Sequence, residues 1–114
     1  MDKREIDKLV AENVMGWKTR KRYEINKRIY EYAFQNINHS DHIIWFDLPE
    51  FSANIKDAWL VVEKLDFDVK VTKYENSAGY QCHVFIPSNV QMVFAETAPM
   101  AICKAALKAV GVEV

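Results

Sequence analysis

The sequence has few glycines, prolines and cysteines, and it has no long apolar run. Its three glycines are isolated from one another, so they cannot form a phosphate-binding loop or a dinucleotide fingerprint. The two cysteines, Cys82 and Cys103, lack the spacing of a zinc site, and we expect both to be reduced, buried thiols. No stretch reaches the roughly 18 apolar residues of a membrane span, and no apolar signal segment follows the charged first residues. These absences predict a cytoplasmic protein without a cofactor, a bound metal or a membrane anchor.

The charge is balanced and the composition is that of a globular protein. Fifteen Lys and Arg residues against 16 Asp and Glu residues give a net charge of -1, which argues against a histone-like polycation and against an acidic tail. Half of the 114 residues are hydrophobic. A chain of this size buries on the order of two thirds of its unfolded surface, so it needs no disulfide to fold. We expect residues 1–114 to form a single domain.

Hydrophobic periodicity predicts two of the helices. The first begins behind Asp2 as N-cap and stops at Gly16. The second follows Ser52, which has the position of an N-cap. Its apolar positions fall on one helix face, which we expect to be buried. These positions are Ile55, Ala58, Trp59, Val62 and Leu65.

The following segment predicts strands and a closing helix. Apolar and polar residues alternate over 67–72 and 80–86, and a third strand is expected over 90–95. Thr97 is the expected N-cap of the last helix, and Gly111 ends it.

Together these elements predict an α+β fold. Its core is a helix, a three-stranded antiparallel meander and a helix, with an additional N-terminal helix. Apolar residues on the second face of the sheet, namely Phe85, Val93 and Ala95, indicate that the N-terminal region covers part of that face. The expected architecture is therefore a layered α/β/α sandwich.

The stretch from Trp17 to Asn38 is ambiguous. Ile25, Ile29 and Ala33 fit a helical stripe, and we favour a helix over part of the stretch, although its aromatic residues also suit strands. Residues 43–46 are too few for a helix and predict a strand or an apolar loop.

Three blocks of the sequence resemble a known family of small phage and prophage proteins. The blocks are residues 6–17 (IDKLVAENVMGW), 51–65 (FSANIKDAWLVVEKL) and 97–107 (TAPMAICKAAL). They are similar to the phage ABA-sandwich domain family, which occurs mainly in phages of Bacillus and related bacteria. The resemblance implies a helix–sheet–helix architecture and a phage origin, with the bacterial host cytoplasm as its location. It implies no activity and no catalytic residues.

The order of a helix, three strands and a helix also resembles a double-stranded-RNA-binding domain. That family carries a lysine cluster at the start of its last helix, where this chain has Thr97, Ala98, Pro99, Met100 and Ala101. The resemblance therefore does not imply RNA binding in that mode.

Six basic residues fall within eleven consecutive positions, opposed only by Glu24. Trp17, Tyr23 and Tyr30 lie among or beside them. Cations near stacking rings suit a phosphate backbone with unpaired bases, whereas most charge runs are simply solvated surface. Both interpretations stay open. The basic residues are Lys18, Arg20, Lys21, Arg22, Lys27 and Arg28.

Other polar clusters predict no chemistry. His39, Asp41, His42 and Asp47 lie within nine residues, but their spacing is not that of a zinc site, so we expect a hydrated loop. His83 follows Cys82 directly, and neighbours in a strand point to opposite faces, so the pair cannot act as base and nucleophile.

The three tryptophans receive different interpretations. Trp59 belongs to the core by its helical phase. Trp17 and Trp45 lie in irregular segments, where an exposed ring, with Tyr23 nearby, marks a candidate interface or ligand cleft.

The sequence thus predicts a non-enzymatic phage accessory protein that binds a host or phage macromolecule, as a homo-oligomer. One alternative is a nucleic-acid-binding module that uses residues 18–28. Another is a protein that binds a small ligand, such as a nucleotide, between protomers.

Overall fold

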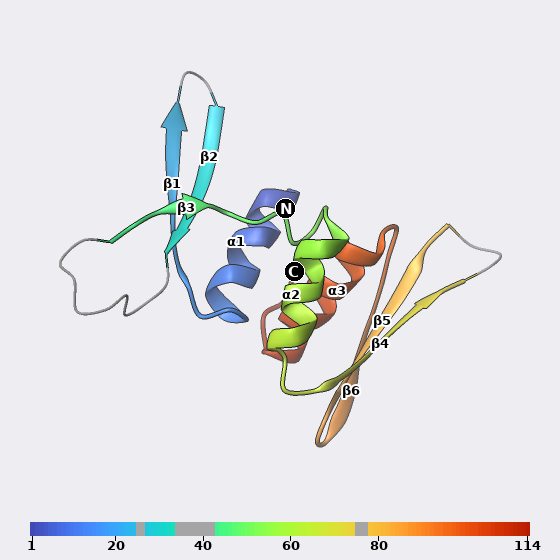
Figure 1. Cartoon of the computed structure of the whole chain (residues 1–114). Coiled ribbons are helices and arrows are strands. Elements are labelled where there is room, and N and C mark those ends of the chain that lie inside the picture. The colour runs from blue at the N-terminus through green and yellow to red at the C-terminus, as the bar shows by residue number, and fades with distance from the viewer. Residues whose placement is uncertain (25–26, 34–42, 75–77) are drawn as a thin grey trace.

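The computed structural model describes residues 1–24, 27–33, 43–74 and 78–114 (Figure 1). Three helices and six strands lie within these ranges. In chain order they are α1 (Lys3–Asn13), β1 (Lys18–Glu24), β2 (Lys27–Ala33), β3 (Phe46–Asp47), α2 (Ile55–Lys64), β4 (Asp68–Lys73), β5 (Tyr80–Ile86), β6 (Asn89–Ala95) and α3 (Ala98–Ala109). Within the described ranges, no helix is both long and apolar enough to cross a membrane.

The strands form two antiparallel sheets with the helices between them (Figure 1). Strands β1, β2 and β3 make one sheet, which contacts α1. Strands β4, β5 and β6 make the other, and α3 packs on β5 and β6 while also contacting α1 and α2. The predicted α+β sandwich class is confirmed, with α3 at the centre of the core.

The helix ends follow from local capping. Asp2 caps α1 by accepting a hydrogen bond from the Glu5 amide, and Thr97 caps α3, as predicted. The prediction for α2 is wrong, because its N-cap is Asn54, whose side chain accepts from the Lys56 amide at 2.9 Å. A turn before α2 brings Asn54 to the cap position and leaves the preceding serine buried.

The phase of α2 also differs from the prediction. Its buried residues are Ala58 and Val61, which lie on one side of the helix. Trp59 and Ile55 are 52% and 53% exposed, so the assignment of Trp59 to the core is wrong. The helix is apolar on two sides, and hydrophobic periodicity alone cannot tell which side faces the core.

The prediction of a helix within 17–38 is wrong where the structure describes that stretch. β1 and β2 pair antiparallel from Lys18 opposite Ala33 to Glu24 opposite Lys27. Residues 46–47 then form the short β3 beside β2. Tyr30 is one of the aromatic residues that suited strands, and it anchors this sheet by its burial in the core cluster.

The predicted meander of β4, β5 and β6 is confirmed. Cys82 and Val84 of β5 are buried toward α3. Val93 and Ala95 lie opposite Cys82 and Tyr80 and so share this inner face, contrary to the expectation that they lie on the second face. Phe85 points to the outer face and is 42% exposed, so among the described residues the expected N-terminal cover is not observed.

Candidate functional site

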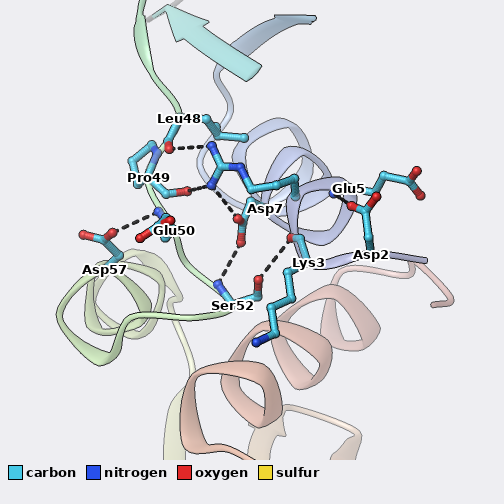
Figure 2. A network of polar contacts seen from close by, with 10 residues as sticks. Asp2, Lys3, Glu5, Asp7, Leu48, Pro49, Glu50, Ser52 and Asp57 are labelled. Atoms are coloured by element: carbon cyan, nitrogen blue, oxygen red, sulfur yellow. Dashed lines mark hydrogen bonds and ion pairs between the residues drawn. The ribbon is translucent and has the colours of Figure 1, made fainter. Parts of the chain in front are cut away.

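A buried polar cluster joins α1 to the segment before α2 (Figure 2). Asp7 is 1% exposed and accepts hydrogen bonds from the Ser52 amide at 2.8 Å and from Arg4 at 2.7 Å. Arg4 also donates to the carbonyl oxygens of Leu48 and Pro49, at 2.8 and 3.2 Å. Each polar group of the cluster therefore has a partner within the protein, and the cluster works as a clamp on residues 48–52.

The electrostatics of this cluster agree with a structural role. Burial raises the pKa of Asp7 above its ordinary value, and hydrogen bonds from Ser52 and the nearby Arg4 charge partly oppose that rise. No sequence motif indicated this cluster, since Arg4 and Asp7 on α1 lie more than forty positions from the residues 48–52 that they hold. The one signal was Ser52, which hydrogen-bonds to the Lys3 carbonyl at 3.1 Å instead of capping α2.

The structure places the predicted basic segment on the β1–β2 pair, which extends away from the helices (Figure 1). Glu31 of β2 is 8% exposed and binds Arg20 at 2.7 Å and Arg22 at 3.4 Å. Arg28 binds Asp2 at 3.1 Å. Three of the six predicted cations are thus paired with carboxylates of the same chain.

The other predicted cations are arranged differently. Lys18 and Lys21 are exposed. The Lys21 ammonium lies 5.6 Å from the centre of the Tyr30 ring and 5.9 Å from that of Tyr23. The backbone of Lys27 lies in β2, and its side chain is outside the described part of the structure.

The predicted interface aromatics are divided between packing and exposure. Trp17 stacks on Tyr32 with ring centres 4.3 Å apart, and it packs against the core. Trp45 lies under the guanidinium of Arg20 at 4.3 Å, and is half-buried. Only Tyr23 of the three is largely exposed. The three rings therefore have different surroundings, and Tyr23 is the one that a partner can reach most easily.

The predicted thiols are buried in the core. Burial raises the pKa of Cys82 to about 11 and raises that of Cys103 further. A thiol with so high a pKa is protonated at neutral pH and is a poor nucleophile.

The residues of the rejected metal site lie mostly outside the described structure. His39, Asp41 and His42 fall in the undescribed range, and Asp47 lies in β3. The parts of the chain that the structure describes contain no group of three potential ligands.

A depression of about 510 Å³ lies beside the clamp. Arg4 and Arg28 line it together with Asp47 and Glu50, so the charges around it are of both signs. Both arginines already bind carboxylates of the chain. This lining gives a nucleotide phosphate little net attraction.

A different surface is open and apolar, namely the outer face of the β4–β5–β6 sheet. Four of its large side chains are exposed, and Phe94 is the most exposed at 56%. The Phe94 ring covers the buried Gly79, where a Cβ atom would overlap it. We call this surface the outer sheet face. It comprises Asp68, Lys70 and Thr72 on β4, Gln81, His83 and Phe85 on β5, and Val90, Met92 and Phe94 on β6.

Sequence reasoning missed this surface. The sequence predicted that Val93 and Ala95 lie on the second face of the sheet. The observed register places Val90, Met92 and Phe94 there instead. The pairing of Met92 with His83 and of Val90 with Phe85 assembles the apolar area from two strands.

Comparisons with known proteins agree with one another. A family model described as the phage ABA sandwich domain matches residues 8–107. A 2.0 Å crystal structure of a phage protein from Bacillus cereus ATCC 14579 is similar to this chain, with 42% identity and a TM-score of 0.71. The match covers 94% of this chain and 90% of that one. No curated protein matches.

Proposed function

The chain belongs to the phage ABA sandwich domain family, and from that premise we propose that it is a non-enzymatic binding protein that docks another protein on its outer sheet face. The observation that carries the proposal is the group of exposed apolar side chains on β5 and β6. Large contiguous apolar patches are uncommon on isolated proteins and often mark interaction surfaces.

The layout of the outer sheet face favours a protein over a nucleic acid. Its apolar side chains lie along β6 and the adjoining end of β5, while Asp68 and Lys70 lie on β4. The apolar side chains therefore gather on one side of the face and the charged ones on the other, and a surface that mixes apolar and polar groups in this way suits a protein partner. A phosphate backbone needs several cations, and this face carries one lysine beside one aspartate.

The absence of catalysis is also part of the proposal. The two thiols are protonated and buried, and the buried carboxylate of Asp7 is engaged by Arg4 and the Ser52 amide. These are the described groups with shifted pKa values, and all three are buried.

The test uses Met92→Lys, which places a charge between Val90 and Phe94, in the middle of the apolar row on β6. Val110→Lys is the matched control, because Val110 is also exposed but lies at the end of α3. Tagged proteins are incubated with nuclease-treated extract of a bacterial host. A photo-crosslinking residue at position 92 then reports what contacts the face.

We expect one protein to be retained by the wild type and by Val110→Lys, and to be crosslinked from position 92. Met92→Lys should lose at least about tenfold in affinity, since a desolvated lysine at the centre of an interface is unfavourable. Equal retention by Met92→Lys, or no retention by the wild type, would overturn the proposal.

Nucleic-acid binding by the β1–β2 pair is the second candidate. The observation that favours it is Lys21, whose exposed side chain lies near the exposed ring of Tyr23 and the buried ring of Tyr30. The ion pairs of Arg20, Arg22 and Arg28 weigh against it, because a phosphate would compete with carboxylates already in place.

Binding to single-stranded oligonucleotides at a series of salt concentrations tests this candidate. If it is correct, Lys21→Glu weakens binding and makes the dependence on salt shallower. Binding that is absent, or that does not respond to salt, rejects it.

A further inference from the structure

Helix α2 exposes a second apolar face that the packing of the chain does not use. Ala58 and Val61 face the core, where α2 packs on α3. On the other side, Ile55, Trp59 and Leu60 are 53%, 52% and 42% exposed. An exposed tryptophan flanked by two large aliphatic residues is unusual on a helix whose other side is already buried.

These residues lie together on one face of the helix. Each residue turns a helix by about 100°, so positions 55, 56, 59, 60 and 63 cover an arc of about 140° opposite Ala58 and Val61. The same five residues line one shallow depression of about 420 Å³. We call this surface the α2 face. Its residues are Ile55, Lys56, Trp59, Leu60 and Glu63.

The charges of the α2 face are arranged symmetrically. Lys56 lies three residues before Trp59, and Glu63 lies three residues after Leu60. The midpoint of the two charges is therefore also the midpoint between Trp59 and Leu60. Both charged residues are exposed.

This arrangement complements itself under a two-fold rotation. If a second copy of the helix runs antiparallel over the first about this midpoint, Lys56 lies opposite the partner's Glu63. Glu63 then lies opposite the partner's Lys56, while Trp59 packs beside the partner's Trp59 and Leu60 packs beside the partner's Leu60 across the two-fold axis. An interface of this kind is isologous, because the same patch serves both subunits and closes the assembly at two.

We propose that α2 is a homodimer interface, in which two copies of the chain pack their α2 faces antiparallel around Trp59 and Leu60. A foreign partner would need its own matching pattern, whereas a second copy supplies the opposite charge at each end by symmetry. The proposal is independent of protein docking on the outer sheet face, which belongs to a different element.

Charge exchange gives the sharpest test. The dimer dissociation constant is measured by sedimentation equilibrium in low salt. Lys56→Glu and Glu63→Lys each place like charges opposite one another at both ends of the interface. Each should weaken the dimer at least about threefold, and the double variant Lys56→Glu/Glu63→Lys should recover wild-type affinity. Glu12→Lys on α1 is the matched control and should leave the dimer unchanged, because Glu12 is an exposed helical glutamate outside this face.

A second variant probes the apolar contact. Trp59→Ala should weaken the dimer at least about tenfold, since buried tryptophans dominate interface energetics. Its folding is checked by thermal unfolding at a concentration where the wild type is monomeric.

The proposal is overturned if the wild type is monomeric at about 1 mM, or if Trp59→Ala dimerises like the wild type. It is also overturned if the double charge variant is no better than the single ones. Met92→Lys should dimerise normally. If Met92→Lys abolishes the dimer instead, the second copy docks on the outer sheet face and α2 is not the interface.

Discussion

The two sheets of this protein are held in place by different forces. The β4–β5–β6 sheet presents an apolar inner face to α3, with Cys82 and Val84 fully buried. The β1–β2–β3 sheet contributes Tyr30 and Ala33 to the interior, but its exposed surface is organised by ion pairs around Glu31. One sheet is therefore stabilised mainly by apolar burial, and the other depends also on charges at the surface.

The difference explains why one sheet was recognisable in the sequence. Burial on one face imposes alternation of apolar and polar residues, and β5 shows it clearly. β1 alternates between charged residues and residues that are also polar, so it has no apolar period to detect.

The largest loss of stability should follow from a substitution in the apolar core between α3 and the β4–β5–β6 sheet. Leu107 of α3 is fully buried. Leu107→Ala removes its contacts and leaves a cavity, so we expect the free energy of unfolding to fall by about 2–5 kcal/mol. Urea denaturation measures it. Val110→Ala at the exposed end of the same helix is the control and should change stability by less than about 0.5 kcal/mol.

If Leu107→Ala lowers the free energy of unfolding no more than Val110→Ala does, the view that α3 forms the centre of the core is wrong.

The second-largest loss of stability should follow from damage to the clamp that joins the N-terminal helix to residues 48–52. Asp7→Ala leaves the buried Ser52 amide without its acceptor, so we expect a loss of about 2–3 kcal/mol. Asp57→Ala is the control, because Asp57 accepts a hydrogen bond from the Glu50 amide at an exposed site. Its effect should stay below about 1 kcal/mol. Equal losses of stability in the two variants would show that the burial of the Asp7 contacts does not increase their contribution to stability.

The ion pairs of the first sheet should contribute less. Glu31→Gln removes the charge that holds Arg20 and Arg22, which are both about half exposed. We expect a loss of about 1 kcal/mol, because solvent screens these arginines. The loss should shrink as salt is added, whereas that of Leu107→Ala should not. A salt-independent loss would mean that Glu31 acts through packing.

The smallest expected effect concerns pH. The pKa of Asp7 is raised in the folded protein above its ordinary value of 3.8, so the folded state holds this proton more tightly than the unfolded state. The stability that this proton contributes is complete below that value and is lost as pH rises through the higher pKa of the folded state.

The variant Asp7→Asn cannot ionise, so it provides the reference. The stability of the wild type relative to Asp7→Asn should fall as pH rises from about 3, and then become constant. Urea denaturation of both proteins across this pH range measures it. A difference that grows with pH would show that hydrogen bonding outweighs burial at Asp7.

Several predictions from sequence held because their causes are local. The N-caps Asp2 and Thr97 bond to amides three residues away, and such contacts need no tertiary partner. The strands of the meander follow from alternation, and the family resemblance rested on blocks that the phage ABA sandwich match spans in large part.

The failures share a physical reason, since each needed information about distant residues. Ser52 has the type of an N-cap, but the Lys3 carbonyl and the Asp7 carboxylate recruit it into the clamp. Trp59 has the phase of a core residue, but α3 packs on the opposite side of the helix.

The candidate surfaces were the least predictable part. The basic segment was found in the sequence, but its carboxylate partners Glu31 and Asp2 become neighbours only when the strands pair and α1 docks. The outer sheet face needed the register of β5 against β6.

By itself, the sequence determined the α+β class, the meander, the N-caps of α1 and α3 and the family, because periodicity and capping act over a few residues. Only the tertiary structure decided which side of α2 is buried, which arginines are neutralised and which apolar side chains are exposed together. Those outcomes depend on contacts between segments far apart in the chain, and an apolar residue has the same identity whether it faces the core or a partner.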